Sequence, residues 1–332
     1  MLRPFIDAHV HLNTNTKAKL KLAKEYDAYF ISINTDIPFF ISLDKQESLI
    51  HELNQIENRS FFITSFDIEY WDTEKWIPHA LNRIKQGISR GAKGVKIWKN
   101  IGMDSRVKDR AGNFVLLDDP RFDPIFQYLS DHNILLINHQ GEPRNCWLPL
   151  EEMTVDSDRD YFSEHPEYHM YKNQDYPSYE EHIKARDNVL QRYPNLNYVG
   201  LHLFSMEWSL DEVAKRLEQF PNSKTDLAER ICHVQLQTIE NREKVRDFFI
   251  KYQDRIIYGT DVIDDGSMNA EEVAAKFQHL WNYHWTYFST DSWMKAAEFE
   301  GTFQGLKLPE EVLYKIFFQN AVETYNLNFP VN

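Results

Sequence analysis

The sequence contains few cysteines and no long apolar segment. Only two cysteines occur in 332 residues, Cys146 and Cys232, and neither belongs to a CxxC pair. A disulfide framework is therefore not expected. No apolar run approaches the roughly 18 residues that cross a bilayer, and the first predicted strand begins soon after Met1 without a signal peptide. We expect a soluble, cytoplasmic protein that has no membrane partner.

Positive charge is also scarce. The chain has 37 lysines and arginines against 51 aspartates and glutamates, which gives a formal net charge of -14. There is no local basic patch, so a nucleic-acid backbone would be repelled. No glycine-rich phosphate loop follows the first predicted strand. The expected partner is a small-molecule substrate, and self-association into a homo-oligomer stays open.

The chain is rich in apolar residues and alternates short strands with longer helices. Hydrophobic residues make up 42% of it, enough for one large core, and we expect a single domain over residues 1–332. Predicted helices separate the strands. The eight predicted strands cover residues 5–12, 28–33, 60–66, 94–98, 134–139, 198–202, 225–228 and 255–261. This alternation predicts an α/β fold, a (β/α)8 TIM barrel, with an open doubly wound sheet as the competing arrangement.

Residues 141–177 form a long irregular segment after the fifth predicted strand. The segment is rich in tyrosine, proline, histidine and acidic residues. Long loops in compact domains are often functional, so we interpret it as a lid over the barrel mouth. The alternative is a surface excursion whose aromatic side chains pack on the outside of the barrel.

The first predicted strand carries two histidines, His9 and His11, two positions apart. Side chains alternate along a strand, so Asp7, His9 and His11 are expected on one face. Two imidazoles side by side at a strand end can ligate one divalent metal.

Other polar side chains stand at the ends of later predicted strands, where barrel enzymes place their functional groups. They are Lys96, His139, His202 and Asp261. The set His9, His11, His139 and Asp261 supplies three nitrogens and one oxygen, which suits Zn²⁺, with Mn²⁺, Fe²⁺ or Co²⁺ as alternatives. A water in the remaining position would have its pKa lowered to about 7.

Several motifs resemble those of a known family. The stretch Asp7-Ala8-His9-Val10-His11 resembles the opening motif of the amidohydrolase superfamily of metal-dependent hydrolases. The later motifs resemble its amidohydrolase family 2 branch, which includes hydrolases, lactonases and decarboxylases. They are Gly94-Val95-Lys96-Ile97, Asn138-His139, Gly200-Leu201-His202-Leu203, Tyr258-Gly259-Thr260-Asp261 and Asn320-Ala321.

The resemblance spans nearly the whole chain and implies roles for individual residues. It makes His9, His11, His139 and Asp261 metal ligands, and makes Asp261 also the proton acceptor from the metal-bound water. His202 becomes either a second-site ligand or an acid that faces the substrate.

Lys96 has two interpretations under this resemblance. In two-metal relatives the equivalent lysine is carboxylated and bridges both metals, whereas in mononuclear relatives it is an ordinary charged group. We expect one metal ion per chain, with a second ion and a carboxylated Lys96 as the alternative. A free Lys96 ammonium could meet a substrate carboxylate or form a salt bridge with a neighbouring acid.

Further residues are candidates for substrate binding. Arg230 could bind an anionic group through two hydrogen bonds, or could pair instead with Asp226 or Glu229. Three tryptophans are expected to form aromatic walls of the site. They are Trp98, Trp147 and Trp208.

The expected reaction is hydrolysis of an amide, lactone or ester in a small, carboxylated or sugar-derived substrate by a metal-activated water, with Asp261 and His202 as catalytic residues. The alternative on the same fold is metal-dependent, non-oxidative decarboxylation of an aromatic or muconate-type acid. A phosphoesterase or nuclease, and a binding protein that keeps a structural metal, are further rivals.

Overall fold

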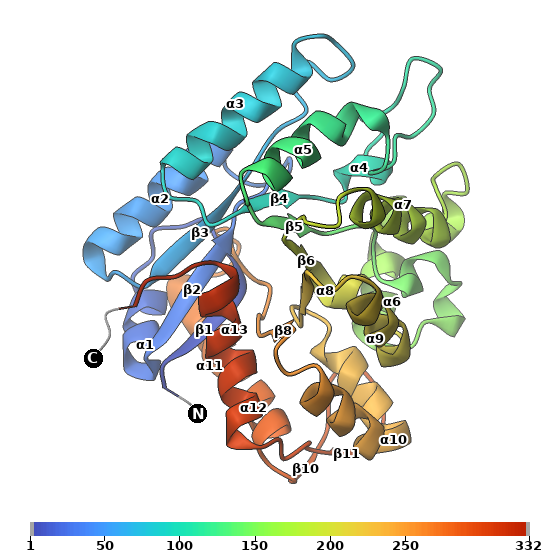
Figure 1. Cartoon of the computed structure of the whole chain (residues 1–332). Helices are drawn as coiled ribbons and strands as arrows, with labels where there is room; N and C mark the ends of the chain where they lie inside the picture. Colours follow the sequence, from blue (N-terminus) through green and yellow to red (C-terminus); the bar gives the residue numbers. More distant parts are fainter. Residues whose placement is uncertain (1–2, 330–332) are drawn as a thin grey trace.

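The computed structural model describes residues 3–329. Its strands form a central sheet with helices around it (Figure 1). The strands are β1 (Phe5–Leu12), β2 (Ala28–Ile33), β3 (Ser60–Ser65), β4 (Val95–Ile97), β5 (Leu136–Asn138), β6 (Tyr198–Gly200), β7 (Ser223–Asp226), β8 (Ile256–Ile257) and β9 (Val262–Asp264), with a separate hairpin of β10 (Trp293–Met294) and β11 (Phe303–Gln304).

Helices follow most strands and return the chain to the start of the next one. The longer helices are α1 (Ala18–Tyr26), α2 (Leu43–Ile56), α3 (Trp76–Ser89), α5 (Asp123–Asp131), α6 (Asp156–Glu164), α7 (Tyr179–Arg192), α9 (Leu210–Gln219), α10 (Ile231–Lys251) and α11 (Ala270–Ser289). The shorter ones are α4 (Asn100–Met103), α8 (Leu201–Phe204), α12 (Glu310–Tyr314) and α13 (Asn320–Thr324), and a π-helical turn over Lys315–Gln319 joins the last two.

The strand order is β8-β7-β6-β5-β4-β3-β2-β1-β9, and neighbouring strands are parallel. β8 pairs with β7 and β9 pairs with β1, so these two short strands occupy one position and close the barrel. Between them, the Tyr258 carbonyl accepts a hydrogen bond from the Ala8 amide (3.0 Å), and the Asp261 amide donates to the His9 carbonyl (2.8 Å). The predicted (β/α)8 barrel is confirmed. Its eighth strand is interrupted over residues 258–261, between β8 and β9.

Local sequence signals explain where several helices begin and end. Ser178 and Glu181 form a capping box at the start of α7, and the Ser209 hydroxyl accepts from the Glu212 amide at the start of α9. Gly91 follows α3 with a φ of 103°, as expected for a glycine that ends a helix. α10 begins at Ile231, five residues after β7 ends, and its geometry breaks at Asn241.

Two layers of apolar side chains form most of the core. One fills the inside of the barrel with residues such as Ile6, Ile31, Ile137 and Val199. Tyr325, which follows α13, belongs to the same inner cluster. The other layer lies between the strands and the surrounding helices. Leu313, Ile316 and Phe317 are buried in it, so the final helical segment packs on the barrel.

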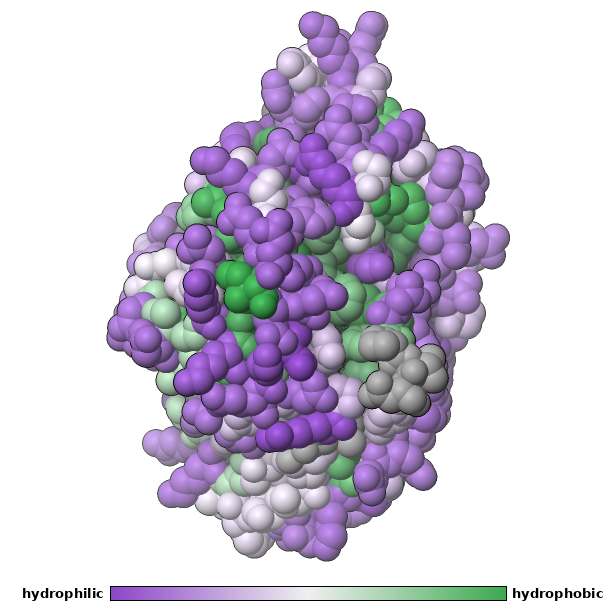
Figure 2. Space-filling view, turned by 90° about the vertical axis from the view of Figure 1, so that its left-hand side faces the viewer, coloured by the Kyte–Doolittle hydropathy of each residue, from purple (hydrophilic) through white to green (hydrophobic). Residues whose placement is uncertain are grey.

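One face of the molecule is mostly polar. Figure 2 shows one face on which hydrophilic residues dominate and hydrophobic residues form small, separate patches. Scattered apolar groups of this kind are normal on a protein surface. Among the helices of residues 3–329, none has the length and hydropathy needed to cross a membrane.

Candidate active site

The ends of the strands surround a cavity of about 520 Å³. Most of the polar residues predicted to act together line this one cavity. They are His9, His11, Lys96, Trp98, His139, His202, Arg230 and Asp261. Because they come from β1, from β4 and from the segments that follow β4 to β8, the parallel barrel itself brings them together.

His9, His11 and Asp261 form the tightest group of metal-compatible atoms in the cavity. Both His9 Nε2 and His11 Nε2 lie 3.2 Å from Asp261 Oδ1. Among residues 3–329, neither His9 Nε2 nor Asp261 Oδ1 has a hydrogen-bond partner, although both atoms are buried. Buried polar atoms are normally satisfied, and two nitrogens and a carboxylate oxygen suit a divalent transition metal. These residues therefore fit a metal ion.

His139 lies further along the cavity wall. Its ring centroid is 4.2 Å from that of His202, and its buried Nε2 atom has no hydrogen-bond partner in the described part of the chain. It does not belong to the group of donors that lie within 4.8 Å of one another, which contains His9, His11 and Asp261. The structure thus places three of the four predicted ligands together and the fourth beside His202.

Asp7 does not share a face with the two histidines, contrary to expectation. The pairing of β1 with β2 shifts register between Asp7 and Val10, which interrupts the alternation of side chains. Asp7 instead accepts hydrogen bonds from Trp281 Nε1 (2.8 Å) and the Thr260 amide (2.9 Å). Burial raises the pKa of Asp7 to about 7. Asp7 therefore supports the segment that carries Asp261 from outside the cavity.

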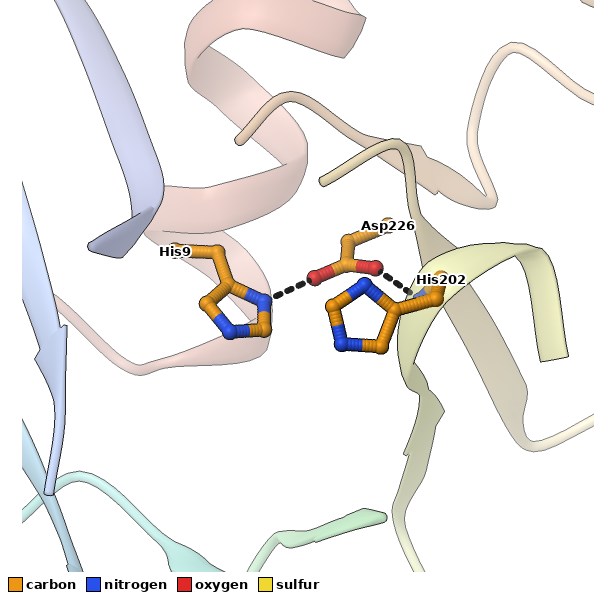
Figure 3. A group of neighbouring side chains, drawn as sticks. All are labelled: His9, His202 and Asp226. Carbon is orange, nitrogen blue, oxygen red and sulfur yellow. Dashed lines mark hydrogen bonds and ion pairs between the residues drawn. The ribbon is translucent and has the colours of Figure 1, made fainter. Parts of the chain in front are cut away.

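Asp226, the last residue of β7, was missed as a site residue. One of its oxygens lies 2.6 Å from His9 Nδ1, and the other accepts from the His202 amide at 2.5 Å (Figure 3). Burial raises its pKa to about 6, so the carboxyl group is ionised at neutral pH. His9 must then donate from Nδ1, which leaves the lone pair of Nε2 facing Asp261. The available signal was an acidic residue inside the seventh predicted strand, 225–228.

His202 does not end β6 but begins a turn of unusual handedness. Residues 202–205 all have φ between 54° and 59°, at a cost of about 1–2 kcal/mol per residue. His202 Nδ1 donates to the Ala228 carbonyl (2.9 Å), and Nε2 lies 4.0 Å from Asp261 Oδ2. Burial lowers the pKa of His202 to about 3. The imidazole is therefore neutral, with the lone pair of Nε2 directed toward Asp261.

Lys96 brings a buried positive charge to the cavity without a partner. No carboxylate of residues 3–329 lies within 4.0 Å of its ammonium group, so the alternative of a salt bridge is not observed. Burial lowers the pKa of Lys96 to about 8, and Asp261 and Asp226 oppose this shift.

Two more cations line the same cavity. Arg230 pairs with Glu229 (3.1 Å), one of the open alternatives, and its buried Nε atom has no hydrogen-bond partner in the described chain. Lys99, which the sequence did not indicate, donates to Glu142. Burial lowers the pKa of Lys99 to about 8, and Arg230 contributes to the shift. A cavity with these side chains can bind an anionic group.

The three tryptophans expected to form walls have different positions. Trp98 lines the cavity, but Trp147 and Trp208 do not. Trp147 Nε1 donates to the Pro177 carbonyl (3.2 Å), and Trp208 Nε1 donates to the Tyr179 hydroxyl (2.9 Å). Both indoles are therefore used in packing around the start of α7, which corrects the expectation for these two residues.

The segment 141–177 contributes one side of the cavity, as a lid would. α6 supplies Ser157, Asp158, Tyr161 and Phe162 to the lining. Phe39 and Phe40, from the loop between β2 and α2, line the cavity as well, and the Phe40 ring centroid lies 5.1 Å from that of His11. These two phenylalanines were also missed, because an isolated apolar pair in a loop carries no signal of its own.

Comparison with known proteins identifies the family. A family model described as Amidohydrolase matches residues 73–327. The chain belongs to the amidohydrolase family, in agreement with the motifs read from its sequence. A search of curated proteins gave no match.

Solved structures with the same fold share little sequence with this chain. An uncharacterized TIM-barrel protein from Bordetella bronchiseptica has a TM-score of 0.53 at 14% identity, over 97% of this chain and 99% of that one. 2,6-Dihydroxybenzoate decarboxylase from Rhizobium has 0.53 at 11%, over 98% and 99%. Dihydroorotase from Campylobacter jejuni has 0.51 at 15%, over 98% and 84%. At these identities the likeness shows the fold alone.

Proposed function

We propose that the protein is a metal-dependent hydrolase that cleaves an amide, lactone or ester bond in a small anionic substrate. The observation that supports this most is the convergence of His9 Nε2, His11 Nε2 and Asp261 Oδ1, with two of these buried atoms unpartnered within residues 3–329. These three residues would hold one divalent ion, with His139 as the fourth ligand if its ring moves closer. Zn²⁺ is the first candidate, and Mn²⁺, Fe²⁺ and Co²⁺ are alternatives.

When bound, such an ion acts as a Lewis acid that makes water more acidic and a carbonyl carbon more electrophilic. The protein would supply the proton transfers. Asp261 Oδ2 would accept a proton from the attacking water and pass it to the leaving group. His202 Nε2, 4.0 Å away with its lone pair free, would stabilise that proton or relay it. Both groups act as bases at neutral pH because His202 is neutral and Asp261 is ionised.

The cations of the cavity would orient the substrate. Lys96 and Arg230 would bind a carboxylate of the substrate, because each is buried with hydrogen-bonding capacity left unused by residues 3–329. Trp98, Phe40 and Tyr161 would cover the apolar part of the substrate. α6 would limit the entry of water over the reacting bond.

The first experiment measures metal content and turnover together. Elemental analysis of the wild type should give about one equivalent of metal, which a His9→Ala/His11→Ala variant should lose. His132→Ala, which removes an exposed histidine, should keep it. The metal-loaded wild type should open some member of a panel of lactones, amides and esters of small carboxylic acids.

Two results would overturn the proposal. The first is a wild type that binds none of the four metals after reconstitution. The second is a metal-loaded protein that hydrolyses nothing in the panel but releases carbon dioxide from aromatic or muconate-type acids. That outcome would replace hydrolysis by decarboxylation at the same residues.

A further inference from the structure

The turn over residues 202–205 has four consecutive residues in the left-handed region, with φ values of 56°, 57°, 59° and 54°. None of the four is glycine, asparagine or aspartate, the residues that tolerate this conformation best. Such a turn persists only when its surroundings hold it. The contacts that hold it therefore decide where His202, its first residue, points.

Two side chains of α7 hold the far end of this turn. The Tyr179 hydroxyl donates to the Ser205 carbonyl (2.6 Å), and Arg186 Nη1 donates to the Phe204 carbonyl. The Arg186 guanidinium also lies over the Phe204 ring, 5.3 Å from its centroid. Tyr179 and Arg186 are seven residues apart and so lie on the same face of the helix. Both are buried.

The near end of the turn is fixed by the neighbouring strand β7 and the residues that follow it. The His202 amide donates to Asp226, and His202 Nδ1 donates to the Ala228 carbonyl. The second hydrogen bond selects the tautomer that leaves Nε2 free, 4.0 Å from Asp261. If the far end were released, the turn could relax toward right-handed angles, and this alignment of the imidazole would be lost.

We infer that Tyr179 and Arg186 are positioning residues, which hold the left-handed turn and so keep His202 Nε2 directed at Asp261. The catalytic consequence rests on the proposed function, because only that proposal makes His202 a proton-transfer group. The positional consequence does not rest on it. The alternative is that both side chains only fill the space between α7 and the barrel.

Tyr179→Phe tests this inference, since it keeps the ring and removes one hydroxyl, which donates to the Ser205 carbonyl and also accepts from Trp208 Nε1. In the metal-free protein, the histidine ¹⁵N NMR signals should show that His202 no longer occupies a single Nδ1–H tautomer. In the metal-loaded enzyme, kcat should fall by about tenfold with little change in KM, because alignment rather than substrate binding is lost. Tyr287→Phe is the matched control, since it removes another buried hydroxyl, which lies 2.6 Å from the Thr238 hydroxyl.

Ser205→Gly provides the rescue. Ser205 has φ 54°, and its buried hydroxyl has no hydrogen-bond partner in the described chain, so glycine relieves the conformation without losing a contact. The double variant Tyr179→Phe/Ser205→Gly should recover the single tautomer and most of kcat. Arg186→Met should lower kcat and disturb the His202 tautomer as Tyr179→Phe does. Arg186→Lys, which keeps the positive charge, should retain part of the wild-type kcat and tautomer preference.

An unchanged His202 tautomer in both Tyr179→Phe and Arg186→Met would overturn the inference. A changed tautomer that Ser205→Gly does not restore would also overturn it, since a space-filling role predicts no rescue by glycine. The NMR measurement needs neither metal nor turnover. Failure of the wild type to hydrolyse any substrate would therefore count against the proposed function and leave this inference to be decided by the His202 signals.

Discussion

His9 Nδ1 and Asp226 Oδ2 lie 2.6 Å apart inside the barrel, although 217 residues separate them in the sequence. The same carboxylate also accepts from the His202 amide, so one acid orients both a candidate metal ligand and a candidate proton-transfer group. Asp226 and the Nδ1 atom of His9 could suggest a second metal site, because their atoms lie close to those of His202. Their hydrogen bonds assign Asp226 instead to orienting His9.

Asp226→Asn should weaken metal binding by about 10–100-fold, the usual effect of removing such a partner. Asparagine offers one accepting oxygen to the two donors that Asp226 now serves. If that oxygen keeps the backbone amide of His202, the asparagine nitrogen faces His9 Nδ1 and donates to it, so the imidazole would be protonated on Nε2 and lost as a ligand. Competition with a chelator measures the affinity. Asp265→Asn, at an exposed aspartate after β9, serves as the control. Equal affinities in the variant and the wild type would show that Asp226 does not set the tautomer.

Lys96→Met should leave the metal content at about one equivalent and raise KM for anionic substrates. The reason is that Lys96 is interpreted as a free ammonium that meets the substrate, not as a ligand. Elemental analysis and steady-state kinetics measure the two effects. If the wild type instead held two equivalents, with the mass of a carboxylated lysine, and the variant lost one of them, the mononuclear interpretation would be wrong.

Tyr161→Ala and Phe162→Ala should raise KM, because both side chains line the cavity from α6. Tyr171→Ala is the matched control. It removes an aromatic side chain from the same segment that is 47% exposed and does not line the cavity. Kinetics that stay the same in all three variants would mean that the segment does not act as a lid.

Gly200→Ala should destabilise the protein by about 1–3 kcal/mol, the usual range for overpacking a core. A Cβ at this position would lie 2.2 Å from the Phe204 ring, which cannot move freely inside the turn. Urea unfolding measures the change. Gly112→Ala is a useful comparison, since it places a Cβ at an exposed position with open space around it and meets only backbone strain. A Gly200 variant that is no less stable than this one would contradict the expectation.

Stability should depend on pH through His182, whose pKa burial lowers to about 4. In the unfolded chain a histidine titrates near 6.5. Between these values the unfolded chain binds a proton that the native protein excludes. The contribution of His182 is therefore complete above about pH 6.5 and is lost as the pH falls to about 4, on the order of 3 kcal/mol. His182→Gln should unfold with a shallower pH dependence over this range. An identical dependence would show that His182 binds its proton equally well in the native and the unfolded protein.

The sequence predicted the barrel well because each strand is marked by a pattern of residues that are close together in the chain. Short apolar runs such as Ala28–Ile33 depend on residues close in the chain, and this strand is found where it was expected. His9, His139 and Asp261 line one cavity, as expected for side chains at the strand ends of a parallel barrel, and their roles stay predictions.

The remaining features depend on contacts between distant segments. The register shift in β1 that turns Asp7 outward arises from pairing with β2, and no pattern within the strand reveals it. The left-handed turn at His202 depends on Arg186 and Asp226 and not on its own residues, which disfavour it. Trp147 was mistaken for a wall of the cavity because indole side chains suit both binding sites and packing around helices.

The break in the eighth strand has a consequence for how the protein is made. The Thr260 amide donates to the Asp7 carboxylate, although 253 positions separate the two residues in the sequence. At the same junction between β1 and the broken eighth strand, the Asp261 amide donates to the His9 carbonyl. Contacts so distant in the chain form late, because loop closure over such lengths is slow. During synthesis the two histidines of the first strand emerge long before the aspartate they need. A nascent chain that stops short of residue 261 would therefore lack the proposed metal site, however much of the barrel it had already folded.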